Sequence, residues 1–386
     1  MDAKTFSAVV EQTRKILREH PLCDHCIGRM FAGNLGMKSH RRLGNKIRSK
    51  LKQHPPRTCY VCKNLMSTLE QQAKKMIEAS KDYQFSTFLI GAILQPSIHD
   101  RDDSIRSKFR LRGITSIKGD VTRELGKILS RKTRSVVDYH NPDIVFTMDF
   151  KKDFCEIKPK ALLLQGRYTK QVRDLPQKQK PCDQCEGRGC FVCDFHGIRE
   201  FNSVEGKVAK FFIEKFGAQQ ARITWIGSED ESSLVLGNGR PFFAKLVNPH
   251  KRQLRLGKKI DLRGVSILGI RPINKIPSDP VRFRTVVEMK IEAERDLEPA
   301  QLGKLASLVE RPVVLYEDSH HHKKSIYSIK FKQTSENTLS VKMESDGGLP
   351  LKRFVAGHQV EPSISSLLET NCRCAQFDFN KIITSK

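Results

Sequence analysis

Eight of the eleven cysteines occur in four Cys-x-x-Cys pairs, a spacing that lets two thiolates of one tight turn bind the same metal ion. The pairs are Cys23/Cys26, Cys59/Cys62, Cys182/Cys185 and Cys190/Cys193. Two such pairs complete a tetrahedral zinc site. Disulfides are the alternative, but the N-terminus shows no secretory signal, so we expect a cytoplasmic, reducing environment in which disulfides are rare. A redox-active pair would usually stand alone at the start of a helix. We therefore expect structural zinc.

The spacing leaves open which pairs share an ion, and whether one or two ions are bound. A basic, helix-like stretch over residues 39–52 separates the first two pairs, a usual span between zinc knuckles. The other four cysteines lie within residues 182–193, where Gly187 and Gly189 can form the tight turns of a short wrap. The remaining cysteines have no partner pair and are interpreted as ordinary thiols: Cys155, Cys372 and Cys374.

An acidic turn in the second half of the chain precedes a predicted hairpin. The turn reads Gly227-Ser-Glu-Asp-Glu, and Asn238-Gly239 follows between two apolar stretches, which predicts a type I′ hairpin. A carboxylate such as Asp230 is a candidate nucleophile or base. An aspartate in such a segment is more often a turn residue, so the local sequence leaves both roles open.

The charge indicates a polyanionic partner. Lys and Arg number 69 against 43 Asp and Glu, a net charge of +26, whereas solubility of a small domain needs a magnitude of only about 2–8. Nucleic acid is favoured over an anionic membrane, because the cations are spread through folded-looking segments. A hydrophobic content of 38% excludes a wholly disordered basic tail. The sequence shows no apolar run near the ~18 residues of a membrane span.

The elements that must position these residues indicate an α+β protein. A length of 386 residues predicts two or three domains at roughly 100–200 residues each. Apolar periodicity predicts helices over 5–19, 63–81, 119–131, 207–216 and 299–309, and strands over 85–94, 143–150, 222–226, 283–291, 326–331 and 339–343. The cluster His320-His-His-Lys-Lys324 is expected to be a solvated loop.

Four domains or segments follow from this organisation. We expect a helical zinc-knuckle segment (1–62), an α/β RNA-binding domain (63–175), a linker with a four-cysteine knuckle (176–200) and a mostly antiparallel catalytic-type domain (201–386).

Several segments, in the same order along the chain, resemble the archaeal and eukaryotic tRNA pseudouridine synthases that carry an N-terminal THUMP domain. They are Cys23-Asp-His-Cys-Ile-Gly-Arg, Cys59-Tyr-Val-Cys, Gly166-Arg-Tyr-Thr-Lys, Asn202-Ser-Val-Glu-Gly, the run from Gly227 to Phe242, and Gly348-Leu-Pro-Leu-Lys-Arg-Phe-Val-Ala-Gly357. The resemblance spans nearly the whole chain. It implies a divergent archaeal member of the family that modifies uridine 54, uridine 55 or both in the TΨC loop, with a THUMP-like α/β domain and a pseudouridine synthase catalytic domain.

The resemblance also implies site residues and partners. Asp230 matches the family's catalytic aspartate, and Lys352 its lysine beside the carboxylate. Leu351 and Phe283 would lie against the uracil, and Arg240 would help to bind substrate. Isomerisation oxidises nothing, so no organic cofactor is expected beside the structural zinc. The expected partner is tRNA, with no membrane and no obligate protein partner.

Three departures from the family pattern keep a second hypothesis open. Ser228 replaces an arginine, Phe283 replaces a tyrosine, and Tyr316-Glu-Asp-Ser-His-His-His-Lys-Lys replaces a basic, Arg-rich loop near 316–328. The first hypothesis is an active tRNA pseudouridine synthase with Asp230 as nucleophile. The alternative is a zinc-containing tRNA-binding or tRNA-folding protein of weak or no catalytic activity.

Overall fold

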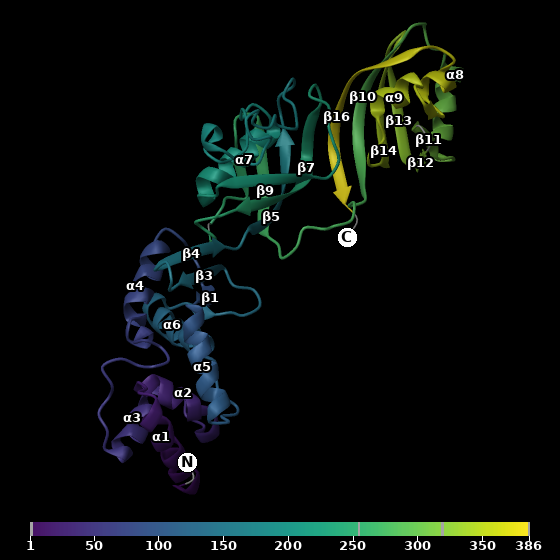
Figure 1. Ribbon diagram of the computed structural model, residues 1–386. Coiled ribbons are helices and arrows are strands. Elements are labelled where there is room, and N and C mark those ends of the chain that lie inside the picture. Colours follow the sequence, from purple (N-terminus) through teal and green to yellow (C-terminus); the bar gives the residue numbers. More distant parts are fainter. Residues whose placement is uncertain (1–2, 254, 318–319, 385–386) are drawn as a thin grey trace. The chain divides into compact units, whose positions relative to one another are not determined.

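The chain forms two compact units, residues 1–160 and 161–386, in a computed structural model that describes residues 3–253, 255–317 and 320–384 (Figure 1). The division falls just before the first strand of the second unit. The four predicted domain and segment boundaries stay predictions. Among the described residues, no helix combines the length and the apolar character needed to cross a bilayer.

The N-terminal unit has a helical part and an α/β part (Figure 1). The helical part comprises α1 (Ala3–Glu19), α2 (Asp24–Leu35) and α3 (His40–Leu51). The α/β part comprises a 3-10 turn (Leu65–Ser67), α4 (Leu69–Ala79), β1 (Thr87–Ile93), α5 (Pro96–Lys108), α6 (Ile117–Thr133), β2 (Val136–Val137), β3 (Ile144–Asp149) and β4 (Phe154–Pro159). The sheet order is β2-β1-β3-β4, and β1 runs parallel to both of its neighbours.

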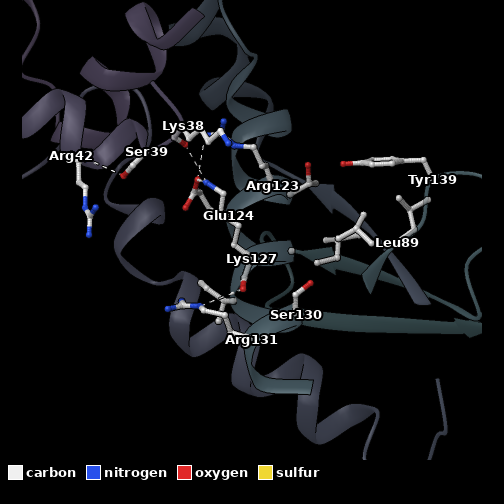
Figure 2. Close-up of a pocket in the computed structure, with 15 residues that line it drawn as sticks. Lys38, Ser39, Arg42, Leu89, Arg123, Glu124, Lys127, Ser130, Arg131 and Tyr139 are labelled. Atoms are coloured by element: carbon white, nitrogen blue, oxygen red, sulfur yellow. Dashed lines mark hydrogen bonds and ion pairs between the residues drawn. The ribbon is translucent and has the colours of Figure 1, made fainter. Parts of the chain in front are cut away.

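Helix α6 shows how the sequence sets up this unit. Its N-terminus is capped by Ser116, whose hydroxyl accepts a hydrogen bond from the backbone N–H of Gly119. Val121, Leu125 and Leu129 recur every four residues and are buried against the core, as the predicted helical period requires. Lys127, Arg131 and Lys132 of the same helix are exposed, and the first two line the pocket of the N-terminal unit that Figure 2 shows.

The C-terminal unit is built on a nine-stranded sheet. Its order is β13-β14-β10-β16-β7-β5-β9-β8, with β6 paired to β7, and β16 with β7 is the one parallel pair that the described strands of this sheet form. The strands are β5 (Leu162–Lys170), β6 (Gln220–Trp225), β7 (Leu234–Val247), β8 (Lys259–Asp261), β9 (Val265–Pro272), β10 (Phe283–Ala293), β13 (Ile326–Ser335), β14 (Thr338–Asp346) and β16 (Cys372–Thr384).

Helices and a small second sheet complete the C-terminal unit. They are a 3-10 turn (Phe191–Cys193), α7 (Val204–Phe216), α8 (Pro299–Gly303), a 3-10 helix (Lys304–Val309), β11 (Val313–Glu317), β12 (His320–Lys324), α9 (Leu351–Ala356), β15 (Val360–Glu361) and α10 (Ile364–Leu368). The small sheet has the order β12-β11-β15. Helix α7 ends where Gly217 adopts a left-handed φ of 58°, as its position after the apolar run suggests.

The hairpin predicted at Asn238-Gly239 is wrong, because β7 continues through it as one strand. On β5, Tyr168 pairs with Arg240 but Lys170 pairs with Val235, so residues 236–239 bulge opposite a single residue. Gly239 has a φ of 71°, and a Cβ there would lie 2.5 Å from the carbonyl oxygen of Tyr168. The local Asn-Gly signal therefore marks a bulge that brings two strands close together.

The loop predicted at residues 320–324 is also wrong. This segment is strand β12, which pairs antiparallel with β11. His321, His322 and Lys323 are exposed, so the expected solvation holds although the backbone is extended and paired. An uninterrupted run of polar residues on an exposed edge strand is hard to distinguish from a loop in the sequence.

Candidate functional site

The loop between β6 and β7 presents Asp230 to a cation from a distant segment. Lys352 Nζ, in the first turn of α9, donates a hydrogen bond to Asp230 Oδ2 at 2.7 Å. The other carboxylate oxygen accepts from Ser232, from its backbone N–H at 3.1 Å and from its hydroxyl at 2.6 Å. The structure thus brings together the two residues that sequence reasoning paired.

These contacts keep the carboxylate ionised. Burial alone would raise the pKa of Asp230, but the hydrogen bonds from Lys352 and Ser232 outweigh it and hold the pKa at about 2. The Asp230 side chain is 29% exposed and that of Lys352 is 56% exposed. A charged carboxylate that solvent can reach can attack a carbon atom or accept a proton, whereas it cannot act as an acid at neutral pH.

A second acid in the same turn, Glu229, is fully buried among donors. Its carboxylate accepts from Tyr168 Oη at 2.7 Å, and it forms ion pairs with Arg240 Nε at 3.3 Å and Lys170 Nζ at 3.4 Å. Burial, and then the nearby charge of Glu229, raise the pKa of the Tyr168 hydroxyl, so that it remains a donor. Adjacent residues of one turn therefore lie in opposite environments.

Lys170 connects this buried cluster to the backbone of the loop. Its ammonium group donates to the carbonyl oxygens of Asp230 and Glu231, both at 3.0 Å, and of Leu175 at 3.1 Å. Its side chain is fully buried. Three carbonyls and one carboxylate around one ammonium group satisfy its donors, and they fix the loop on which Asp230 stands.

Sequence reasoning missed Glu229, Tyr168 and Lys170 as residues of the site. Tyr168 and Lys170 lie in the segment Gly166-Arg-Tyr-Thr-Lys, which was noted for its resemblance without any role for its side chains. The available signal was a lysine at the end of a strand that begins with three leucines, because a lysine must find a partner if it is buried.

Arg240 lies beneath the loop. Its guanidinium contacts Glu229, donates to the carbonyl oxygen of Ile226 at 3.1 Å and lies 4.5 Å from the ring centroid of Phe379. The side chain is 1% exposed. Among the described residues, its buried Nη2 atom has no hydrogen-bond partner. Its predicted contact with substrate stays a prediction.

Phe283 packs between two glycines of the site. A Cβ at Gly227 would lie 2.5 Å from its ring, and one at Gly347 would lie 2.3 Å from it. The backbone N–H of Gly347 donates to the carbonyl oxygen of Phe283 at 2.7 Å. The half-buried ring thus links the Asp230 loop to the turn before α9, the helix whose first residue, Leu351, is buried.

The cysteines form two groups of four, and this grouping shows which Cys-x-x-Cys pairs could share an ion, the question that the spacing left open. Sγ atoms of Cys23, Cys26, Cys59 and Cys62 lie within 4.8 Å of one another, and so do those of Cys182, Cys185, Cys190 and Cys193. Tetrahedral zinc with Zn–S bonds of about 2.3 Å sets sulfur atoms about 3.8 Å apart.

The measured geometry fits that requirement. The Cys23–Cys62 distance is 3.7 Å, and Cys193 lies 3.8 Å from both Cys185 and Cys190. Backbone N–H groups point at sulfur in the second group, from Gly189 to Cys185 at 3.1 Å and from Gly197 to Cys193 at 3.3 Å. Such donors stabilise thiolates, the form that binds zinc.

Comparison with known proteins first defines the class. The description "Pus10 THUMP domain, archaeal" matches residues 72–149, and "Pus10, C-terminal" matches residues 163–265 and 312–382. An N-terminal THUMP domain and a C-terminal pseudouridine synthase domain are thereby established, and the predicted α+β fold class is confirmed. Phe283 falls between the two matched C-terminal segments.

The curated relatives then define the family. The chain is 44% identical over 379 residues to "tRNA pseudouridine synthase Pus10" of Nitrosopumilus maritimus, covering 98% of this chain and 99% of the relative. It is 37% identical over 369 residues to the protein of the same name from Cenarchaeum symbiosum, covering 96% and 91%. The chain belongs to the Pus10 family of tRNA pseudouridine synthases, which are isomerases. The predicted enzyme class is confirmed.

Solved structures are more distant. The chain of a Cbf5–Nop10–Gar1 complex aligns with a TM-score of 0.29 and 6% identity over 46% of each chain. An H/ACA ribonucleoprotein bound to a substrate RNA aligns with a TM-score of 0.29 and 5% identity, over 55% of this chain and 47% of that one. At this distance neither alignment bears on the site.

Proposed function

We propose that this protein converts uridine to pseudouridine in the TΨC loop of tRNA, at uridine 54, uridine 55 or both, with Asp230 as the nucleophile. The observation that carries the proposal is the ionised, accessible carboxylate of Asp230 held by Lys352. The tRNA position follows from the family resemblance, and the partner from the names of the relatives.

The reaction needs only what this site offers. The carboxylate of Asp230 attacks C1′ of the ribose, and the bond from C1′ to N1 of uracil breaks. The uracil rotates, C5 bonds to C1′ and the carboxylate leaves. C5 loses one proton and N1 gains one, so the composition is unchanged and no oxidant or reductant is consumed. The uridine must first leave its stack, which costs a few kcal/mol.

The other site residues have supporting roles in this proposal. Lys352 keeps the nucleophile charged and oriented, while Phe283 and Leu351 provide the apolar surface for uracil. Lys170 and Glu229 hold the loop. The two four-cysteine groups each bind one structural zinc ion, whose binding free energy contributes to folding.

The experiment is a modification map. Unmodified tRNA transcript is incubated with the purified chain, and pseudouridine is located by carbodiimide treatment and primer extension. We expect a stop at one or both of these TΨC-loop positions with the wild-type chain. Asp230→Asn, which keeps the shape and removes the charge, should abolish the stop while tRNA binding persists. Modification by Asp230→Asn at the wild-type rate would overturn the role of Asp230.

A second candidate function rests on Ser228, where the family has an arginine. It is a tRNA-binding or tRNA-folding protein that has kept the scaffold with little catalysis. The same modification map distinguishes the two candidate functions, because the second requires that the wild-type chain binds tRNA without forming pseudouridine. Restoring the family residue with Ser228→Arg would then be expected to produce modification.

A further inference from the structure

The end of strand β12 contacts the turn that precedes α9. Lys324, the last residue of β12, donates a hydrogen bond from Nζ to the carbonyl oxygen of Gly347 at 2.7 Å. A Cβ at Gly348 would lie 3.4 Å from the same nitrogen, so the ammonium group packs against the backbone of both glycines. Lys324 is half-buried at this contact. A lysine of the histidine-rich strand is therefore directed into the protein.

The preceding lysine of the strand has the opposite environment. Successive side chains of a strand point to opposite faces, and Lys323 is exposed. A hydrogen bond from a charged donor is stronger than one between neutral groups, so the contact of Lys324 can hold a turn in place. The two adjacent lysines thus provide a variant and its matched control on one strand.

The turn that Lys324 contacts also holds the aromatic ring of the site. The backbone N–H of Gly347 donates to the carbonyl oxygen of Phe283 at 2.7 Å. A Cβ at Gly347 would lie 2.3 Å from the Phe283 ring, so the ring packs directly on the glycine backbone. A shift of this turn must therefore move the ring or open a gap beside it.

The same turn leads into the helix that carries Lys352. Helix α9 begins at Leu351, and Lys352 Nζ meets Asp230 Oδ2 at 2.7 Å. Because α9 follows the turn directly, the place of Gly347 affects where the helix begins. One hydrogen bond from Lys324 thus acts on a turn that is connected to both Phe283 and Lys352.

The residue before Gly347 is anchored independently. The Asp346 carboxylate accepts from the backbone N–H of Ser325 at 2.8 Å and from Tyr327 Oη at 2.9 Å. The backbone N–H of Asp346 also donates to the carbonyl oxygen of Ser325 at 2.9 Å. These contacts do not involve Lys324, so we expect the chain to stay folded around Asp346 when the Lys324 side chain is changed.

We propose that Lys324 is a positioning residue of this enzyme, whose hydrogen bond to Gly347 sets the places of Phe283 and Lys352 relative to Asp230. The proposal deepens the proposed function, on which it rests for the reaction. Lys324 acts through the turn and does not touch the uridine. The end of the histidine-rich strand, which replaces the basic loop of the family, thereby acquires a role in the site.

Kinetics at saturating tRNA test the role in the reaction. Misplacing a reacting group by about 1 Å can cost about 100-fold, so Lys324→Met should lower kcat by about 10-fold to 100-fold with little change in KM. Lys324→Arg keeps a charged donor and should recover most of this loss. Lys323→Met removes the same charge at the exposed neighbour and should keep the wild-type kcat. Equal kcat values for Lys324→Met and Lys323→Met would overturn the proposal.

Hydrogen exchange of the full chain tests the contact without any reaction. The backbone N–H of Gly347 should exchange about 10-fold to 150-fold faster in Lys324→Met than in wild type, the factor for one hydrogen bond to a charged group. Lys324→Arg and Lys323→Met should exchange as wild type does. Unchanged exchange in Lys324→Met would overturn the proposal whether or not the chain forms pseudouridine. Failure of the proposed function would be seen separately, as no pseudouridine from the wild-type chain.

A direct contact between Lys324 and a tRNA phosphate would give a different result. It requires a higher KM in Lys324→Met and a slope of log K against log salt that is smaller by about 0.7–0.9. The value of kcat and the exchange of the Gly347 amide in the free protein would stay as in wild type. That combination would overturn the positioning role.

Discussion

Replacing Lys170 with methionine tests whether the buried cluster holds the loop that carries Asp230. The ammonium group that is removed is fully buried and donates to the carbonyls of Leu175, Asp230 and Glu231. Removing one partner of a buried ion pair costs about 3–5 kcal/mol. Here Glu229 keeps two other donors, so we expect the lower limit, about 3 kcal/mol, for Lys170→Met.

The matching change at Glu229 should cost more. Glu229→Gln leaves Lys170 and Arg240 as two buried cations without their shared anion, whereas Lys170→Met leaves the anion with Arg240 and Tyr168. The loss of unfolding free energy in the double variant should be smaller than the sum of the two single losses by about 1–3 kcal/mol. The reason is that each single change leaves a buried charge that the other change removes.

The assay uses the protein's single tryptophan. Trp225 lies in the C-terminal unit, with its ring centroid 5.1 Å from that of Tyr168, so its fluorescence during urea unfolding reports this unit. Lys245→Met, at an exposed position on β7, serves as the control and should stay within about 0.5 kcal/mol of wild type. Pseudouridine formation should fall with Lys170→Met through kcat more than through KM.

One result would refute this reasoning. If Lys170→Met unfolds at the same urea concentration as Lys245→Met and keeps the wild-type kcat, the three carbonyl contacts do not hold the loop. An additive double variant would separately show that Lys170 and Glu229 do not interact.

Three further outcomes are expected. Burial raises the pKa of Asp230, and Lys352 makes the largest contact that lowers it, so Lys352→Met should raise this pKa. The rate of Lys352→Met at about pH 5, relative to its rate at about pH 7.5, should therefore fall, whereas in the wild type Asp230 is ionised down to about pH 2 and the ratio is kept. An unchanged ratio in Lys352→Met would contradict this. Cys26→Ala should reduce bound zinc from two ions per chain to one by metal analysis, with the C-terminal unit unaffected; two retained ions would contradict the grouping. Gly347→Ala places a Cβ 2.3 Å from the Phe283 ring and should lower kcat/KM for tRNA, with zinc content unchanged as its control; wild-type kcat/KM would show that the ring's position does not matter.

Features that depend on near neighbours in the chain were accessible to sequence reasoning. The apolar period of residues 119–131 predicted α6, and the alternation from Phe283 predicted β10. The cysteine spacing predicted four knuckles, since two thiols of one tight turn are near each other in any fold. These patterns depend on residues only a few positions apart, which the sequence displays directly.

The Asn238-Gly239 pair shows where such reasoning ends. Its left-handed glycine suits a hairpin, but it equally suits a bulge in which the Tyr168 carbonyl approaches the backbone. The choice depends on which strands lie alongside, because β5 pairs with β7 on both sides of the bulge and β16 pairs with the two residues of β7 before it. The pattern of residues in β7 itself contains no information about those neighbours.

The adjacent acids Glu229 and Asp230 mark the same division within the site. The sequence by itself determined that a short acidic turn follows β6, and the family resemblance singled out Asp230. Only the tertiary structure decided that Glu229 is enclosed by Lys170 and Arg240 while Asp230 meets Lys352 from α9. An acid's exposure and charge depend on the side chains that fold against it, and here Lys170 and Lys352 come from a strand and a helix distant in the sequence.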